Sequence, residues 1–599
     1  MRNCKSILFI VLLLVPALIS SAKNEKDGKW SGSFSLSGGT NLFPAKYDAA
    51  FSNTSGEGAF KLSYRAPKFI LNTSLSGAGS MLSTYVGAGS VIAFDEQALK
   101  YNLDITVQNT RKSNLKLSAD ATWIPNARNR FIVSVNDGYN HEAPLKSTTS
   151  EGSDNSGFID MSYTYTYEES DNNKNRFENA YTWDHSFLKD GRKLLTKADW
   201  YITEDDRYSL RISGKGKEDA IENISADKCY RLTPHYRDYH YGIISKYSDK
   251  DFAGVSRLNF DASLEFSVKG NLDNFSAANY IPDKGNGHWE DSLRYKETFY
   301  YSTITVRPTA HAKYETGKFR FEGEITPEYF TDRLHNETYK ENFDPGAIAP
   351  VGEWKVTYSP SSVSKISATG KRSISRPAYL NLCWFQRPGA YINELQQGNP
   401  NLLPSVTNKI VLSYDLTAGK FSGNLEAGFS KVEDKIERTF SEETIGDRKY
   451  RIYTWINAGF SNTLNGKLTL KWLGRKLKAD VTGNYNLVTN VDQKGNSSRN
   501  SDYNIKANAS YDFAHNWKVL SRLRYQSKII RSYSSITEYV GLDLRLEKKI
   551  KKTSLFIEGR DLLDKDIITE TISEDRKKIR EETNTYNRRV ILLGATFNF

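Results

Sequence analysis

The last eleven residues of the chain, Arg589 to Phe599, place an apolar side chain at every second position. Successive side chains of a β-strand point to opposite faces, so one face of this segment is apolar throughout. That face holds Ile591, Leu593, Ala595, Phe597 and Phe599. A strand with one apolar face and one polar or small-residue face is typical of a barrel wall between lipid and a polar lumen. The segment therefore predicts a strand of a membrane-embedded barrel.

The first residues predict export. The chain begins with the positive charges of Arg2 and Lys5. A short apolar core, Ile7 to Ile19, follows, and Ser20 to Ala22 supply small side chains at a cleavage position. This is the pattern of a secretory signal peptide, and its core is too short for a spanning helix. We expect residues 1–22 to be removed and residues 23–599 to form one domain. In an exported chain, a terminal aromatic such as Phe599 predicts recognition by the bacterial outer-membrane insertion machinery.

Composition excludes a helical membrane protein. Hydrophobic residues make up 38% of the chain, and the mean hydropathy is −0.59. No segment after Ile19 reaches the roughly 20 apolar residues that a spanning helix requires. The aromatic share is 13%, with 36 tyrosines, which suits a barrel in which only half of each strand meets lipid. Cys229 and Cys383 remain after cleavage, and their spacing leaves open whether they form a disulfide.

The C-terminal half alternates over segments of seven to ten residues, which indicates strands exposed to two different environments. These segments include Ile410 to Leu416, Phe421 to Phe429, Tyr503 to Tyr511, Trp517 to Tyr525, Val540 to Leu546 and Leu555 to Gly559. Short turns between strands are predicted at Tyr358 to Ser361, Ala418 to Lys420, Leu473 to Lys476, Ala514 to Asn516 and Lys548 to Lys552. Long polar loops are predicted at Ser373 to Thr407, Phe440 to Lys449, Thr489 to Asp502, Gln526 to Glu538 and Lys565 to Asn587. Short periplasmic turns that alternate with long outward loops are characteristic of outer-membrane barrels.

This spacing gives about 11 strands from Gly352 to Phe599, at roughly 10 residues per strand. The segment from Trp30 to Pro350 has room for as many. Candidates there are Phe60 to Tyr64, Tyr101 to Val107, Leu115 to Ala119, Phe131 to Val135, Tyr163 to Tyr167 and Leu258 to Leu264. The predicted fold is an all-β antiparallel transmembrane barrel of about 22 strands, within a range of roughly 20 to 24.

Several segments resemble the barrel of TonB-dependent receptors. Arg372 to Leu382 contains Ser375-Arg376-Pro377-Ala378-Tyr379, and Gly398 to Pro404 reads G-N-P-N-L-L-P. Three further matches are Asn457-Ala458 with Leu464 to Leu468, Phe556 to Lys565 with Arg560-Asp561-Leu562-Leu563-Asp564-Lys565, and the final strand. They cover the last 250 residues or so in the family's order, in a style similar to Bacteroidota outer-membrane proteins. The prolines and Gly398-Asn399 also have a purely structural interpretation, as strand ends and turns, which we favour.

The chain departs from that family at its N-terminus. The resemblance implies a plug domain before the barrel, whereas the first strand-like segment begins at Trp30, soon after the expected cleavage site. We therefore predict a barrel without a plug. Because lumen size grows with strand number, an inward loop, another protein or a cargo is expected to fill it. Two long loops are candidates, Gly270 to Lys296 with Trp289, and Ser373 to Thr407. The second carries Cys383, Trp384, Phe385 and Tyr391, for which loop packing is the favoured role over a binding patch.

No catalytic, cofactor-binding or metal-binding residues are predicted. The chain lacks the nucleophile-elbow, zinc-protease and phosphate-loop motifs. Asp184-His185 has no nucleophile beside it. His235-Tyr236 and Tyr239-His240-Tyr241 form a dense His/Tyr group, but on a strand His235 and His240 point to opposite faces. An aromatic girdle explains the group without iron or haem.

The predicted function is transport or partner binding at the cell surface, as a component of an outer-membrane complex and not as an enzyme. Expected partners are outer-membrane lipid and lipopolysaccharide, the insertion machinery and a second protein that fills the barrel. Nucleic acid is not expected. The formal net charge is +11. Basic residues in the lumen or on the rim, such as Lys518, Arg522 and Arg524, would attract anionic solutes, bind lipopolysaccharide phosphates outside, or compensate acids such as Asp543 and Glu558. Two alternatives stay open at this point: a passive pore for solutes, including anions, and a structural or adhesion-type surface protein.

Overall fold

The fold is that of a computed structural model. It describes residues 28–40, 54–94, 97–155, 162–188, 191–215, 229–232, 235–275, 277–281, 288–291, 297–337, 341–343, 346–384, 386–388, 394–445, 448–491, 495, 497–530, 534–563, 567–572, 578–585 and 590–598. The expected signal peptide and the terminal Phe599 lie outside these ranges. No helix in the described ranges is long and apolar enough to cross a membrane.

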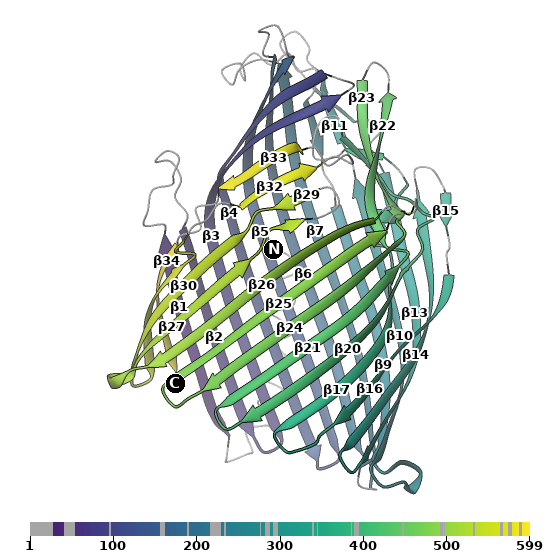
Figure 1. The fold of residues 1–599 in the computed structure, drawn as a ribbon, viewed down its shortest axis with the longest axis vertical. Coiled ribbons are helices and arrows are strands. Elements are labelled where there is room, and N and C mark those ends of the chain that lie inside the picture. The colour runs from purple at the N-terminus through teal and green to yellow at the C-terminus, as the bar shows by residue number, and fades with distance from the viewer. Residues whose placement is uncertain are drawn as a thin grey trace.

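The chain forms a closed antiparallel barrel of 22 strands, so the predicted fold is confirmed (Figure 1). It closes because the first strand pairs with the last, with Phe34 opposite Phe597 and Leu36 opposite Ala595. The first eleven wall strands are β1 (Lys29–Thr40), β2 (Thr54–Ala66), β3 (Phe69–Phe94), β4 (Gln97–Asn126), β5 (Asn129–Asn155), β6 (Ser162–Ser186), β7 (Lys193–Lys215), β9 (His235–Asp249), β10 (Leu258–Phe275), β13 (Glu297–Thr316) and β14 (Phe319–Asn336). The other eleven are β16 (Gly346–Tyr358), β17 (Ser364–Ser375), β20 (Ser405–Ala418), β21 (Phe421–Glu433), β24 (Phe460–Leu473), β25 (Leu477–Val491), β26 (Ser497–Asp512), β27 (Trp517–Gln526), β30 (Tyr539–Ile550), β31 (Thr553–Arg560) and β34 (Val590–Asn598).

The period-two pattern of the sequence sets the two faces of the wall. On β20, Ile410, Leu412 and Tyr414 are 41–57% exposed on the outer face, while Ser413 and Asp415 point to the lumen. Such exposure of large apolar side chains is expected only where lipid is the solvent. The short turns at one end, including the 3-10 turns η2 (Phe252–Gly254) and η4 (Ala514–Asn516), mark the periplasmic side. All five predicted short turns lie there.

The strands β3 to β7 are 23 to 30 residues long and rise far above the others (Figure 1). The strands next to the junction of β1 and β34 are shorter. Above them the wall is continued by hairpin strands, and Tyr85 to Gly89 of β3 pair there with the strand β33. Hence the predicted loops contain strands of their own, which is a correction. The additional strands are β8 (Cys229–Leu232), β11 (Ala277–Ile281), β12 (His288–Asp291), β15 (Glu341–Phe343), β28 (Ile529–Ile530), β29 (Ser534–Ile536), β32 (Ile567–Ile572) and β33 (Lys578–Thr585).

A second, four-stranded sheet stands beside the extracellular mouth. It consists of β18 (Gln386–Pro388), β19 (Glu394–Gln397), β23 (Arg448–Asn457) and β22 (Ile436–Ile445). The last two form a hairpin that projects from the barrel (Figure 1), where the sequence predicted the loop Phe440 to Lys449. The pairing of β19 with β23 is parallel. This sheet joins a lumenal loop to a surface hairpin.

Candidate functional site

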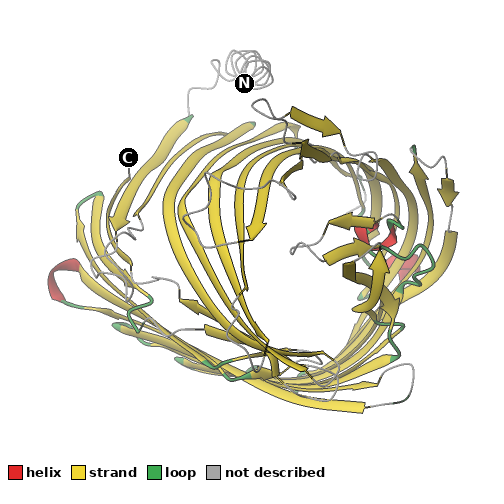
Figure 2. Ribbon diagram, turned by 90° about the horizontal axis from the view of Figure 1, so that it is seen from above, coloured by secondary structure: helices red, strands yellow, loops and turns green. Residues whose placement is uncertain are grey.

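The loop between β17 and β20 folds into the barrel and forms the candidate site. We call residues 376–404 the lid; residues 385 and 389–393 of it lie outside the described ranges. It contains the one-turn helix α2 (Tyr379–Leu382) and the strands β18 and β19. Seen from above, short helical and strand segments lie within the ring of wall strands (Figure 2). The wall strand stops at Ser375 just before Pro377, which has no N–H to continue the ladder.

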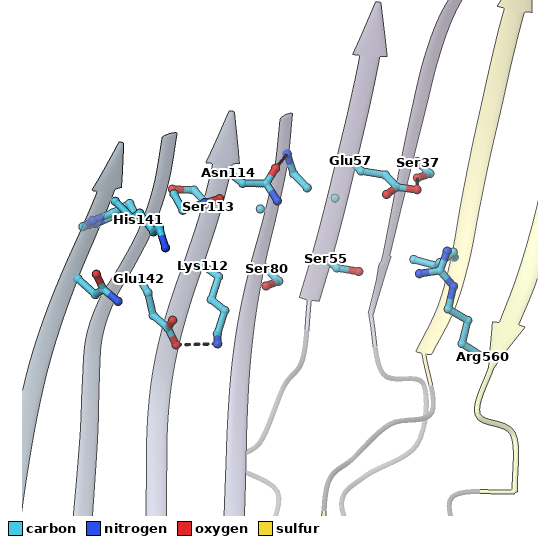
Figure 3. Close-up of a pocket in the computed structure, with 17 residues that line it drawn as sticks. Ser37, Ser55, Glu57, Ser80, Lys112, Ser113, Asn114, His141, Glu142 and Arg560 are labelled. Atoms are coloured by element: carbon cyan, nitrogen blue, oxygen red, sulfur yellow. Dashed lines mark hydrogen bonds and ion pairs between the residues drawn. The ribbon is translucent and has the colours of Figure 1, made fainter. Parts of the chain in front are cut away.

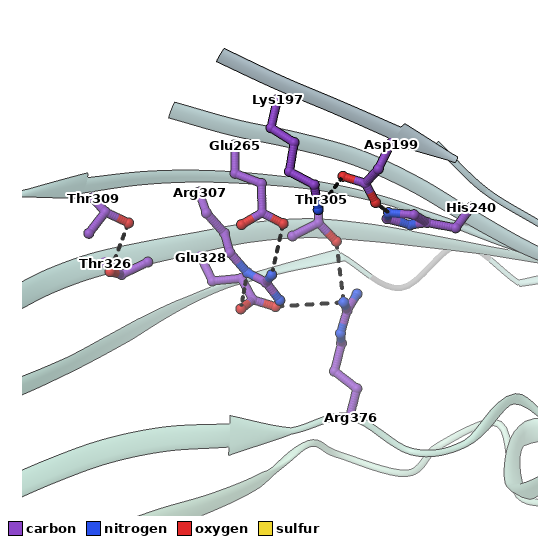
Figure 4. Close-up of polar contacts among 10 residues, drawn as sticks. All are labelled: Lys197, Asp199, His240, Glu265, Thr305, Arg307, Thr309, Thr326, Glu328 and Arg376. Atoms are coloured by element: carbon purple, nitrogen blue, oxygen red, sulfur yellow. Dashed lines mark hydrogen bonds and ion pairs between the residues drawn. The ribbon is translucent and has the colours of Figure 1, made fainter. Parts of the chain in front are cut away.

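Arg376 attaches the lid to the inner wall (Figure 4). Its Nη1 donates to Thr303 Oγ1 at 2.7 Å and its Nη2 to Thr305 Oγ1 at 3.2 Å, both on β13. The same guanidinium lies 3.7 Å from Glu328 Oε1 and 3.5 Å from Asp332 Oδ1 on β14. Both acids are 5% exposed. An ion pair so shielded from water is costly to break from one side, because the remaining charge stays buried.

Glu328 is shared between two arginines. Arg307 Nε lies 2.7 Å from Glu328 Oε2, and Arg307 Nη1 lies 3.3 Å from Glu265 Oε1 on β10. The cluster thus sets the two guanidinium groups of Arg307 and Arg376 against the three carboxylates of Glu265, Glu328 and Asp332. Since acids are in excess, each arginine is needed to hold this part of the wall, and Arg376 is the one that the lid supplies.

An apolar cluster continues the attachment above the ion pairs. Phe299 and Leu334 of the wall are fully buried, in contact with Leu382, Cys383 and Leu402 of the lid. Partly buried side chains packed around them are Tyr301, Tyr379, Trp384, Ile436 and Trp455. Burying a large apolar side chain contributes about 1.5–3 kcal/mol. The lid is therefore held by apolar packing as well as by charge, and the predicted packing role is confirmed for Cys383 and Trp384.

Inside the lid, two backbone segments touch. The N–H of Gly398 donates to Cys383 O at 2.5 Å, and the N–H of Asn399 donates to Asn381 O at 2.6 Å. A Cβ on Gly398 would overlap the backbone N and O of Cys383. Only glycine permits this close approach. The G-N-P segment thus returns the chain against the end of α2.

The surface hairpin binds the end of the lid. Asn399 Nδ2 donates to Trp455 O at 3.1 Å. Asn457 Oδ1 accepts from the N–H of Leu403 at 2.9 Å, while Asn457 Nδ2 donates to Leu403 O at 3.0 Å and Asp434 O at 2.8 Å. The asparagine side chain therefore replaces a backbone ladder at the point where the lid, β22 and β23 meet.

We expect Asn457→Ala to loosen this junction. Three hydrogen bonds are lost, at about 1 kcal/mol each, so local stability should fall by about 2–3 kcal/mol. Hydrogen exchange of the Leu403 amide in detergent measures the effect. Asn424→Ala, which removes a single lumenal bond to Asp415, is the matched control. Unchanged exchange at Leu403 would show that water replaces the lost contacts fully.

The motif segments of the sequence meet in or near this site. Ser375 to Tyr379, Gly398 to Pro404 and Asn457 all belong to the lid junction described above. The segment that starts at Arg560 forms a separate lumenal corner, where Asp561 has a φ of 47° and accepts from Tyr539 Oη at 2.9 Å. Phe385 and Tyr391 lie outside the described ranges. The side chain of Cys229 is not described either, and Cys383 Sγ lies 3.3 Å from Tyr379 O.

Other residues singled out in the sequence do not converge. Asp184 points to the lumen and pairs with Arg130 at 2.8 Å, whereas His185 Nδ1 is on the outer face at 2.8 Å from Asn129 Oδ1. His240 lies in the lumen beside Asp199, 3.2 Å away (Figure 4), whereas His235 is on the opposite face and pairs with Asp206. Across the described residues, no three His, Cys, Asp or Glu side chains gather as a metal site.

One of the lumenal cations predicted in the sequence is paired with an acid. Lys518, Arg522 and Arg524 do point away from lipid, as predicted. Arg524 Nη2 lies 2.9 Å from Asp543 Oδ1. Gly270 to Phe275, predicted as the start of a loop, is instead part of the wall strand β10. The Arg307 and Glu328 pair was not predicted, because alternation places them in the lumen but does not say which of them meet.

A hollow of about 400 Å³ opens on a different part of the inner wall, over β1 to β6 (Figure 3). Small and amide side chains make it, including Ser37, Ser55, Ser80 and Asn114. Two of its charged side chains are paired within the wall, since Lys112 Nζ lies 2.6 Å from Glu142 Oε1. The hollow thus combines short polar side chains with charged ones, and it lies on a different part of the wall from the charge cluster and the lid.

Comparison with solved structures supports the same fold. The copper transporter OprC is 11% identical, with 96% of this chain and 81% of that chain covered and a TM-score of 0.63. A mutant of the ferric enterobactin receptor PfeA from Pseudomonas aeruginosa is 13% identical, with 96% of this chain and 81% of that chain covered and a TM-score of 0.60. The ferric citrate transporter FecA in its unliganded form is 11% identical, with 95% of this chain and 78% of that chain covered and a TM-score of 0.59. No curated protein matches the sequence.

The model of the outer membrane protein beta-barrel family matches residues 255–599, which is more than half of the chain. The matched part contains the strands that carry the lid, the charge cluster and the surface hairpin. The closed barrel with an apolar outer face agrees with that match and with location in the outer membrane. The chain thus belongs to the outer membrane protein beta-barrel family.

Proposed function

We propose that this chain is the membrane-spanning wall of an outer-membrane transport assembly, and that another polypeptide fills its lumen. The proposal rests first on width. The lumen of a barrel grows with its strand number, and 22-stranded outer-membrane transporters have a lumen that is plugged. OprC and FecA, which share the fold, are named as transporters. A wide wall of this kind needs an occupant to keep the membrane sealed.

The lid carries the transport proposal. A loop that turns into the lumen, and is held there by one ion-pair cluster and one apolar cluster, narrows the mouth on the side of β13 and β14. On this proposal the lid leaves the wall when the ion pairs of Arg376 and the apolar cluster around Phe299 are both released. A merely structural or adhesive surface protein would have no use for such an inward loop.

The plugless character is part of the proposal. The described strands from Lys29 onward lie in the wall, in surface hairpins or in the lid. The occupant is therefore assigned to a second protein. Its proposed seat is the hollow of the lumen lined in part by Ser37, Ser55 and Ser80.

Purification from the native outer membrane tests the assembly. The tagged chain, extracted in mild detergent, is expected to carry a second protein in a fixed ratio, measured by native mass spectrometry. An unrelated barrel of similar abundance, tagged and extracted in the same way, is the control. In planar bilayers the chain alone should conduct ions, and addition of the second protein should close it. If no second protein is purified with the chain and the chain conducts ions, the chain is instead a passive pore.

A further inference from the structure

The outer face of β13, β14, β16 and β17 carries a groove of about 780 Å³. We call it the outer groove. Its walls are large apolar side chains, and its floor consists of glycine and alanine. Ile325 is 70% exposed and Trp354 is 47% exposed, which places both in the lipid phase. The groove therefore opens to the bilayer and not to the lumen.

The strand register explains the groove. Ile325 of β14 stands between Ala310 and Gly352, so it has no side chain of comparable size on either neighbouring strand. One row nearer the periplasm, Trp354 stands between Gly323 and Gly370. In two adjacent rows, a large side chain thus stands between small residues on both neighbouring strands. A cross-strand row of this kind leaves gaps beside each large side chain.

Two of the glycines differ in a way that gives the groove its shape. A Cβ on Gly370 would meet the indole of Trp354, so the ring lies over Gly370. A Cβ on Gly323 would meet nothing within 4 Å. The indole leans towards β17 and leaves the β14 side open. The space beside Gly323 is therefore a channel that opens to the lipid phase.

A cation stands at the extracellular end of the outer groove. Arg372 is exposed on the outer face of β17, in the row of Gly352, on the lid side of Gly370. Its Nη1 donates to Asn408 Oδ1 at 3.1 Å. Glu433, an acid at the same rim, is ion-paired with Lys431 at 2.6 Å. Four of the five N–H groups of the Arg372 guanidinium are therefore left to donate to a ligand.

We propose that the outer groove binds one acyl chain of a phosphorylated lipid of the outer leaflet, with its phosphate on Arg372. Planar guanidinium groups bind phosphate through two parallel hydrogen bonds, and an arginine at the edge of an apolar band places these at headgroup level. Within a bilayer, specific association comes from close packing, which the small residues at Gly323 and Ala310 permit. The charge complementarity between Arg372 and a phosphate favours a lipid over a second copy of the chain.

Gly323→Leu tests the apolar half of the site. A Cβ at residue 323 meets nothing within 4 Å and the leucine faces lipid, so the barrel should fold normally, as judged by its heat-dependent mobility on a gel. Delipidated protein is titrated with purified bis-phosphorylated lipid A and examined by native mass spectrometry. We expect one tightly held lipid on the wild type and at least a tenfold loss of affinity in Gly323→Leu. Gly466→Leu, at an equally open outward glycine on β24, should bind as the wild type does.

Arg372→Gln tests the polar half. This variant should bind phosphorylated and dephosphorylated lipid A equally, whereas the wild type should prefer the phosphorylated form. Equal losses in Gly323→Leu and Gly466→Leu would overturn the proposal, as would an unchanged phosphate preference in Arg372→Gln. A wild-type dimer that becomes monomeric in Gly323→Leu would also overturn it and assign the groove to a contact between copies.

Discussion

Replacement of Arg376 by glutamine is expected to release the lid from the inner wall. Loss of one member of a buried ion pair costs about 3–5 kcal/mol, because the partner charge stays buried. Here Arg307 still neutralises Glu328, so the cost arises mainly at Asp332, and we expect about 3 kcal/mol. That corresponds to roughly a hundredfold faster hydrogen exchange of lid amides, since each 1.4 kcal/mol is a factor of ten.

Hydrogen exchange at Gly398 and Asn399, read by mass spectrometry in detergent, measures this release. Arg320→Gln is the matched control, because Arg320 is a half-exposed lumenal arginine of β14 paired with Glu322 near the periplasmic end. Loss of the Arg320 charge should change the free energy of lid opening, as read by hydrogen exchange, by less than about 1 kcal/mol. Equal exchange in the wild type and in Arg376→Gln would mean that the apolar cluster around Phe299 holds the lid alone.

Gly398→Ala is expected to open the lid from within. The added methyl group would overlap the backbone of Cys383, so the two segments must separate and the hydrogen bonds of Gly398 and Asn399 must break. Overpacking of this kind costs typically about 1–3 kcal/mol, and two lost hydrogen bonds add about 1 kcal/mol each. The expected total of about 3 kcal/mol or more is as large as that of the arginine change.

The measurement for Gly398→Ala is limited proteolysis of the lid in folded barrels, with cleavage sites identified by mass spectrometry. Gly466→Ala serves as the control, since a Cβ there meets nothing within 4 Å. The alanine at residue 398 should admit protease between residues 376 and 404, and the control should not. Protection of the lid in both variants would mean that the backbone shifts enough to accept the methyl group.

The wall of the barrel was predictable because each strand is specified by the alternation of side chains within its own segment. Alternation along Trp517 to Tyr525 or Val540 to Leu546 defines strand, face and environment together, and short turns fix which strands are neighbours. The count of eleven strands from Gly352 onward, and the total of 22, are confirmed. The long strands β3 to β7 were underestimated, because their upper parts, such as Asn140 to Asn155, have no apolar face to reveal them.

The site was predictable only in part. The sequence indicated that Ser373 to Thr407 was large enough to enter the lumen, and that its aromatic residues pack. It did not reveal that Arg376 meets Asp332, which lies far earlier in the sequence, because alternation assigns a face and not a partner. The strands β22 and β33 were missed for the same reason. β33 pairs with the distant strand β3, and β22 pairs with β23, which in turn pairs with β19 of the lid. Short pairs gain stability only from such neighbours.

The parallel pairing of β19 with β23 couples movement of the surface hairpin to movement of the lid. Gln396 of the lid is in register with Tyr453 of the hairpin, so the two segments are adjacent strands of one sheet and not merely neighbours. An antibody, a phage or a surface protein that bends the hairpin outside the cell would pull on Arg376 inside the lumen, with no change in the barrel wall between them. Displacement of the lid would likewise be visible from outside, as motion of the hairpin.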